Sequence, residues 1–190
     1  MLLELLWRPR RVRRRVAALL SVEIAQNTAA LGLQKAMMDI DPGKLGPGFQ
    51  LPTIVWDAAK DSIAELPEAE LRVVVSLYSI YGEINRDSQA VDHLIDRYQS
   101  SAERRDTERE RVTQIFSSLQ AHSESIFIAL KKGREIVPRL RILGSLTGDD
   151  PNVLTDGEYR SRAAKLLEKR TKAVDSASAS LPRDSDDTVG

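Results

Sequence analysis

The chain has 190 residues, which suffices for one domain with a hydrophobic core or for one elongated helical assembly. It contains no cysteine, which excludes disulfides, thiolate metal sites and cysteine nucleophiles and fits a reducing compartment. Aromatic residues make up 5% of the chain, a share that favours packing of helices through aliphatic side chains over a sheet core. The 28 basic and 28 acidic side chains cancel overall but not locally.

The N-terminal arm, residues 1–15, is strongly basic. Its six arginines against Glu4 give a net charge of +5, so the remainder of the chain carries −5. The arginines are Arg8, Arg10, Arg11, Arg13, Arg14 and Arg15. We expect that no window of the sequence reaches the roughly 18 to 20 apolar residues needed to cross a bilayer. The opening MLLELLW is apolar before it is positive, which is the reverse of a secretory signal and the order found where a transmembrane helix meets its cytoplasmic flank. The arm is therefore either the remnant of an anchor or an amphipathic arm.

Three interpretations of the arm fit this pattern. Anionic lipid would attract each arginine by about 1 kcal/mol, while the leucines of the opening stretch and Trp7 enter the interface. Nucleic acid would be bound through its phosphates, although no aromatic residue beyond Trp7 is interleaved with the arginines. A solvated face or a targeting peptide is the third alternative. The adjacent apolar residues favour lipid, so we expect the six arginines to contact anionic lipid, or phosphate in the alternative.

The first part of the chain contains three predicted elements. Apolar residues at steps of three and four predict a helix from Arg10 to about Asp39, with Pro9 in its first turn. The prolines and glycines of DPGKLGPGFQLP end this helix. Thr53 is expected to cap a short helix in TIVWDAAKDSIAEL, and Pro67 is expected to begin the next helix.

A longer apolar repeat runs from Leu77 to Leu140 and keeps one register across the charged stretch QSSAERRDTERER. This register predicts one very long helix with a 3.5-residue seam, and the alternative is a break near Ser100. The second half of a continuous seam would lack a partner within the chain, so we expect it to bind another copy or a partner helix. The seam residues of this partner surface are Val112, Phe116, Leu119, Ile126 and Leu130.

Two asparagines stand among apolar residues. Asn27 lies four positions after Glu23 on the first helix, and Asn85 follows Ile84 in the seam. A buried asparagine is costly unless it is hydrogen-bonded, and it often fixes the register of packed helices. We therefore expect Asn27 and Asn85 to be specificity contacts between the first and third helices, and the alternative is that both face water.

Beyond the seam, the glycines and Pro151 end the long helix. A short helix is expected from Thr155 to about Ala173, because the spacing of Thr155 to Glu158 matches a capping box. The tail, residues 174–190, cannot bury enough apolar surface to order. From Asp175 to Gly190 four aspartates against one arginine give this tail a net charge of −3.

Catalytic motifs do not appear in the chain. The residues three positions before His93 and His122 are Ala90 and Leu119, so the Glu-x-x-His pattern of metal sites in helical bundles is missing. No nucleophile elbow and no phosphate loop are present. We expect no enzymatic activity, no metal and no cofactor, with His93 on the surface and His122 at the edge of the seam.

The order VEIAQNTAAL, LPTIVWDAA and LYSIYGEIN resembles a loose group of uncharacterised bacterial membrane-anchored helical proteins. Members of that group have a transmembrane helix, a basic flank, and the motifs Glu-Ile-x-x-Asn, Leu-Pro-Thr-x-x-Trp and Tyr-x-x-Ile-x-x-Ile-Asn. The likeness covers about residues 10–86 and its motifs are short, and we expect the anchor helix of that group to be missing from this chain. The resemblance implies no activity, but it implies a set of residues that pack the helices together: Glu23, Asn27, Thr53, Trp56, Tyr78 or Tyr81, and Asn85.

These observations predict an all-α protein, an elongated helical bundle or coiled coil with one very long helix. The expected parts are the arm (1–15), a helical domain (16–145), a linker with a short helix (146–173) and a disordered acidic tail (174–190). The predicted function is a non-enzymatic scaffold or interaction module at the cytoplasmic membrane surface that forms homo-oligomers or binds a helical partner. The alternative is a nucleic-acid-associated protein that uses the arm.

Overall fold

A computed structural model describes the backbone of residues 2–40, 50–100, 105–148 and 150–179, and the side chains within residues 9–40, 50–90, 93, 122–148, 150–169 and 172. The all-α class is confirmed, since these residues form helices and no strand. The elements in chain order are α1 (Leu2–Ile40), α2 (Ile54–Ala59), the 3₁₀ turn η1 (Ile63–Glu65), α3 (Glu68–Ser100), α4 (Arg105–Leu143) and α5 (Asp156–Ala179).

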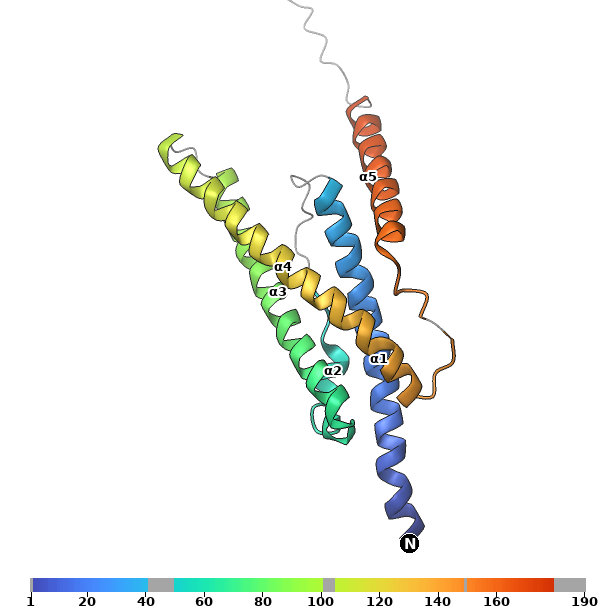
Figure 1. Cartoon of the computed structure of the whole chain (residues 1–190). Coiled ribbons are helices and arrows are strands. Elements are labelled where there is room, and N and C mark those ends of the chain that lie inside the picture. The colour runs from blue at the N-terminus through green and yellow to red at the C-terminus, as the bar shows by residue number, and fades with distance from the viewer. Residues whose placement is uncertain (1, 41–49, 101–104, 149, 180–190) are drawn as a thin grey trace, which may run out of the picture.

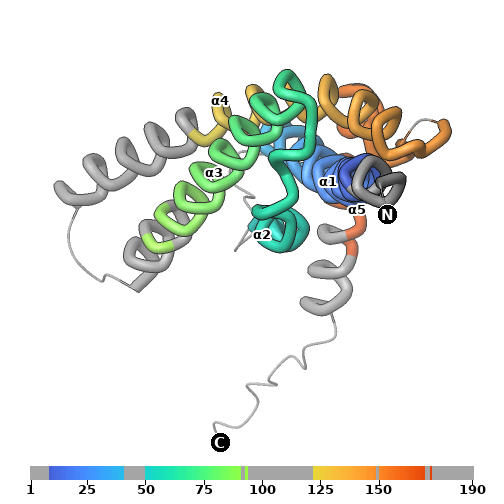
Figure 2. The backbone as a smooth tube through the Cα atoms, turned by 90° about the horizontal axis from the view of Figure 1, so that it is seen from below, coloured from blue at the N-terminus to red at the C-terminus, as the bar shows by residue number. Residues whose placement is uncertain are grey.

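Helix α1 is the element on which the others assemble. It packs against α4, α5, α2 and η1, and α3 packs against α4 (Figure 1). In a view along α1, α3 lies to its left, α4 crosses above it and α2 lies to the lower left (Figure 2). The helix begins at Leu2, earlier than the expected start at Arg10, so Pro9 lies inside it and removes one backbone hydrogen bond. Leucine and arginine, both strong helix formers, flank this proline.

The prediction of a single helix through the charged stretch is wrong. Helix α3 ends at Ser100, and α4 begins at Arg105 and runs back along α3 (Figure 1). The antiparallel register is visible in two cross-links: Arg139 Nε donates to Glu70 Oε1 at 3.0 Å, and Lys132 Nζ donates to Ser76 Oγ at 3.0 Å. The hairpin brings the apolar faces of both halves together, whereas a continuous helix would leave the second face in water.

The hydrophobic core lies where α1, α3 and α4 meet. Apolar side chains from all three helices are completely shielded there, as the 3.6-residue periodicity of each helix requires. The largest of these fully buried apolar residues are Leu20, Ile24, Leu31, Val74, Leu77, Tyr81, Ile84, Ile126, Ile136, Val137 and Leu140.

Close approach of α4 to α1 depends on two glycines. A Cβ atom at Gly133 would overlap the hydroxyl oxygen of Thr28, and one at Gly144 would overlap the backbone of Ala18. The absence of a side chain at these positions lets the two helices pack nearly backbone to backbone. By contrast, a Cβ at Gly82 on α3 would meet no atom within 4 Å.

Helix α5 docks on α1 through a second, smaller cluster. Its Tyr159 and Ala163 pack with Ala36, and the Tyr159 ring covers Gly32. The predicted capping box is present, because Glu158 Oε2 accepts the Thr155 N–H at 2.8 Å. This bond and one from the Thr155 hydroxyl lower the pKa of Glu158.

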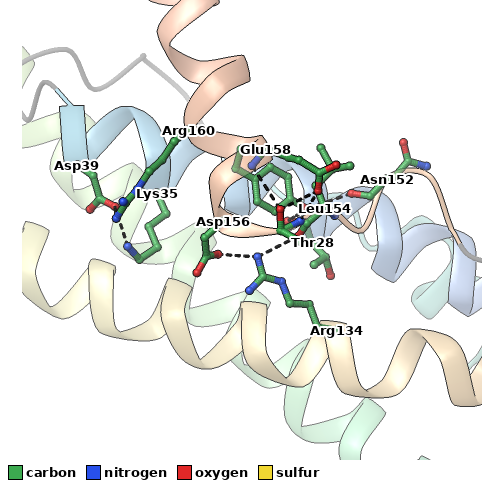
Figure 3. A network of polar contacts seen from close by, with 11 residues as sticks. Thr28, Lys35, Asp39, Arg134, Asn152, Leu154, Asp156, Glu158 and Arg160 are labelled. Carbon is green, nitrogen blue, oxygen red and sulfur yellow. Dashed lines mark hydrogen bonds and ion pairs between the residues drawn. The ribbon is translucent and has the colours of Figure 1, made fainter.

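The start of α5 is also tied to α4. Arg134 donates to the carbonyl of Leu154 at 3.1 Å and to Asp156 at 2.7 Å (Figure 3). The helix runs to Ala179, six residues past its expected end at Ala173, so the first part of the predicted disordered tail is helical. The rest of the tail, 180–190, lies outside the described residues.

The expectation that no window could span a bilayer is wrong: the segment of α1 from Pro9 to Ile40 is long and apolar enough, by length and composition, to cross one. Of its apolar 18-residue window, 61% is buried within the bundle. The core helix of a protein that never enters a membrane has the same length, composition and burial.

We predict that Gly133→Ala destabilises the protein by about 1–3 kcal/mol, because the new methyl group overlaps Thr28 at the contact between α4 and α1. The matched change Gly82→Ala adds the same methyl group to α3 in open space and should stabilise the protein by up to about 1 kcal/mol. Urea denaturation measures both. Introducing Thr28→Ala should recover most of the Gly133→Ala loss, and stabilisation by Gly133→Ala would contradict the close packing.

Candidate functional site

The residues singled out in the sequence occupy three separate places. A basic end of α1 contains Arg10, Arg11, Arg13, Arg14 and Arg15. A buried polar cluster surrounds Glu23 and is here called the Glu23 cluster. A third place surrounds His122. Within the part of the chain that the structure describes, no group of three or more acidic or histidine side chains could hold a metal ion.

The Glu23 carboxylate caps helix α2 from outside. Glu23 is only 4% exposed, and its oxygens accept the backbone N–H of Val55 at 2.7 Å and of Trp56 at 3.3 Å. These N–H groups belong to the first turn of α2 and have no partner within that helix. The Tyr78 hydroxyl of α3 donates to the same carboxylate at 2.5 Å. One side chain of α1 therefore joins α1, α2 and α3.

The expected cap, Thr53, does not perform this role. It occupies the N-cap position, but its side chain makes no capping hydrogen bond and instead donates to Asp57 Oδ2 at 3.0 Å. A carboxylate is a better partner for the positive end of a helix dipole than a hydroxyl, which explains why Glu23 replaces it. The hydrogen bonds from Thr53 and Lys60 lower the pKa of Asp57.

Three aromatic rings enclose the Glu23 cluster. Trp56 stacks on Tyr78 with ring centroids 4.5 Å apart, and Tyr78 meets Tyr81 edge to face at 5.3 Å. Burial raises the pKa of Tyr78, and the Glu23 carboxylate raises it further. Burial also raises the pKa of Tyr81, and the nearby Thr28 hydroxyl offsets part of that rise. Both phenols are therefore held in their protonated form.

Asn27 and Asn85 do not contact each other, but both hold the chain that runs between their helices. Asn27 Nδ2 donates to the carbonyl of Pro52 at 2.9 Å. Asn85 accepts the Leu51 N–H at 2.7 Å and donates to the Leu51 carbonyl at 3.0 Å. The two asparagines thus fix the register of α1 and α3 through a shared segment. All of these partners are backbone groups, which makes the arrangement a structural one.

The structure therefore brings together Glu23, Asn27, Trp56 and Asn85, with Tyr81 at the edge. The residue that the sequence did not single out by itself is Tyr78, which donates to Glu23 and carries the ring contacts to Trp56 and Tyr81. Its spacing of three from Tyr81 was visible, but the identity of its partner depends on the fold.

His122 lies in the core and not at the edge of a surface seam. It is 2% exposed, and its Nε2 lies 3.3 Å from Gln34 Nε2 of α1. Burial lowers the pKa of His122, and the Asp87 carboxylate of α3 opposes part of that shift. His93 is exposed, as expected.

The partner surface expected on the second half of the seam is only partly described. Ile126 and Leu130 are buried in the core of the chain itself, so they give no reason for self-association. The side chains of Val112, Phe116 and Leu119 lie outside the described residues.

The basic end of α1 is a candidate binding surface. It projects past the rest of the bundle (Figure 1), and Arg10, Arg14 and Arg15 are exposed on it. Arg13 differs, because its Nε donates to the carbonyl of Glu65 at 2.6 Å and so ties the arm to the end of η1. The side chain of Arg8 lies outside the described residues. From Pro9 to Met38 the one acidic residue of α1 is Glu23, which is buried.

No family model, curated protein or solved structure matches this chain. The resemblance to membrane-anchored helical proteins therefore stays a prediction.

We predict that Glu23→Ala lowers the free energy of unfolding by about 2–4 kcal/mol, because it leaves the N–H groups of Val55 and Trp56 and the Tyr78 hydroxyl without an acceptor. Urea denaturation followed by tryptophan fluorescence measures the loss. Glu83→Ala is the matched control, since Glu83 is exposed on α3, and it should change stability by less than about 0.5 kcal/mol. Equal effects of the two changes would show that Glu23 holds nothing together.

We also predict that stability falls as the pH is lowered past the usual histidine pKa of 6.5. Because burial lowers the pKa of His122 in the folded state, the unfolded chain binds this proton more readily, and the free energy of unfolding decreases from about pH 6.5 down through the lowered pKa. His122→Gln should flatten this dependence, measured by urea denaturation at several pH values. His93→Gln should leave it unchanged, and an unaltered slope in His122→Gln would refute the prediction.

Proposed function

We propose that this protein is a non-enzymatic helical module that binds an anionic membrane surface through the basic end of α1. The observation that carries the proposal is the exposure of Arg10, Arg14 and Arg15 on the N-terminal part of α1. Each such cation near an anionic bilayer contributes about 1 kcal/mol. Together they supply reversible, salt-sensitive binding.

The composition next to the arm supports lipid over nucleic acid. The apolar stretch LLELLW precedes the arginines on the same helix, and amphipathic helices that rest on membranes combine such apolar residues with flanking cations. Arginines that only bind phosphates need no apolar neighbours. Nucleic acid remains the competing partner in the experiment below.

The arrangement of the helices determines which parts of the protein lie farthest from the basic end. Helices α1 and α5 run in the same direction, so the far end of α5 lies away from the basic end (Figure 1). A molecule held by the basic end would thus present the hairpin of α3 and α4 and the end of α5 toward the cytoplasm. This orientation suits a scaffold or interaction module peripheral to the inner face of the membrane.

We predict that Arg10→Gln/Arg14→Gln/Arg15→Gln weakens binding to vesicles of phosphatidylserine and phosphatidylcholine by about 100-fold, since about 3 kcal/mol of attraction is lost. Co-sedimentation of the full chain at about 150 mM salt measures the partition coefficient. The control variant Lys131→Gln/Lys165→Gln/Lys169→Gln removes three exposed charges from α4 and α5, and it should bind nearly as well as the unmodified chain.

Duplex DNA is tested in parallel under the same salt condition. Retention of DNA without retention of anionic vesicles would replace the membrane proposal by the nucleic-acid alternative. Equal losses in the two triple variants would show that net charge alone, and not the basic end, determines binding.

A further inference from the structure

The outer side of α1 carries a stripe that continues from the basic end toward the middle of the molecule. Its residues follow one another at steps of four, four, three and four positions, which places them on one face of the helix. All five are exposed, and together they are called the α1 outer stripe: Arg11, Arg15, Leu19, Val22 and Gln26.

The centre of the α1 outer stripe is apolar. Leu19 is 47% exposed and Val22 is 43% exposed, although their neighbours Leu20 and Glu23 are buried on the opposite side of the same helix. An exposed leucine alone needs no explanation. Here two large apolar side chains lie one turn apart and directly follow Arg15 on the same face.

The charge of this stripe selects the kind of surface that could cover it. Arginines stand at its N-terminal end, and the acidic residue nearest to it on α1, Glu23, faces inward and is occupied by α2 and α3. An anionic bilayer offers phosphate and carboxylate groups at the level of the arginines and acyl chains just beneath them. Long arginine side chains can reach the headgroups while neighbouring apolar side chains lie deeper.

The rest of the bundle leaves room for this contact. Helix α2 is held on the side of Glu23 and Asn27, and α5 packs against the second half of α1, around Ala29 and Leu33, so the stripe up to Gln26 stays exposed. A bilayer against the stripe would therefore meet α1 without displacing the core, so binding needs no unfolding.

We infer that the first half of α1, up to Gln26, lies against the anionic membrane with the α1 outer stripe facing it, and that Leu19 and Val22 insert among the lipids while Arg11 and Arg15 contact the headgroups. This inference rests on the proposed membrane binding, but it replaces the upright orientation, in which the basic end alone touches the bilayer, by one in which the outer side of α1 also touches it. Insertion of apolar side chains adds a contribution that salt does not screen.

The absence of cysteine from the chain allows a direct test with single labels. Leu19→Cys and Val22→Cys, each carrying an environment-sensitive nitrobenzoxadiazole dye, should show a blue-shifted emission on phosphatidylserine-containing vesicles and quenching by nitroxide-labelled lipid. Ile128→Cys and Ile142→Cys on α4 are the controls, since both positions are exposed and apolar but lie off the stripe. Their emission should stay that of a dye in water.

A second measurement uses the partition coefficient. Leu19→Gln/Val22→Gln should weaken vesicle binding about tenfold, and the loss should persist at high salt. Ile128→Gln/Ile142→Gln is the control and should bind as the unmodified chain does. Thermal unfolding followed by circular dichroism verifies that both variants fold.

The outcomes separate the inference from the proposal beneath it. Vesicle binding with unshifted dyes at 19 and 22 would overturn the inference and leave the basic end as the binding surface. Absence of any vesicle binding by the unmodified chain would overturn both. Blue shifts that require high protein concentration but no lipid would assign the stripe to contact with a second copy of the chain, and would also overturn the inference.

Discussion

The arrangement of the helices depends on the buried carboxylate of Glu23, which requires hydrogen-bond donors in the interior of the protein. Glu23 projects from a buried, mostly apolar side of α1, and its oxygens accept hydrogen bonds from the first turn of α2 and from Tyr78 of α3. A buried charge without such partners would cost several kcal/mol. The position of α2 relative to α1 and α3 is therefore dictated by hydrogen bonding, because a six-residue helix has too little apolar surface to determine its own place.

The same helix divides its faces between two tasks. One side of α1 holds the core residues and the glycine contacts to α4, and α5 docks on the second half of the helix around Ala29, Leu33 and Ala36. On the first half, the outer side carries exposed cations and then exposed aliphatic residues, and no exposed carboxylate lies between Pro9 and Met38. Since the core contacts are made on the inner side, the outer side can change partners at little cost to the fold. This separation makes a peripheral membrane function compatible with a packed helical bundle.

Much of the fold follows from periodicity and from the residues that end helices. The steps of three and four along α1, the start of α3 after Pro67 and the capping box at Thr155 were all legible in the sequence. The break after Ser100 could not be predicted from the sequence. Two antiparallel helices and one continuous helix both keep a 3.5-residue register of apolar residues, and mixed charges at helical spacing are compatible with both structures. The hairpin is favoured over the continuous helix by the burial of Ile126 and Leu130 against residues that are distant in the sequence.

The sequence indicated which residues belong to the candidate site, but not which groups they hydrogen-bond. Glu23, Asn27 and Asn85 stood out as polar groups among apolar neighbours, yet their partners are backbone atoms of residues 51–56, which no pattern identifies. The prediction that Thr53 caps α2 was wrong for the same reason, since the carboxylate of Glu23, distant in the sequence, accepts the N–H groups at the start of α2 instead. His122 was expected at the edge of the apolar seam, but it is buried because α4 folds back against α3 and α1.

The central claim is that the folded bundle binds an anionic bilayer through the outer side of α1 while its core stays closed. Backbone amide hydrogen exchange of the full chain, free and on phosphatidylserine-containing vesicles, tests this claim most directly. The account predicts slower exchange on the vesicles confined to the first half of α1, with unchanged protection in α2, α3 and α4. Faster exchange in residues 54–59 and 68–90 on the vesicles would contradict it, because α1 would then have left its partners to enter the membrane.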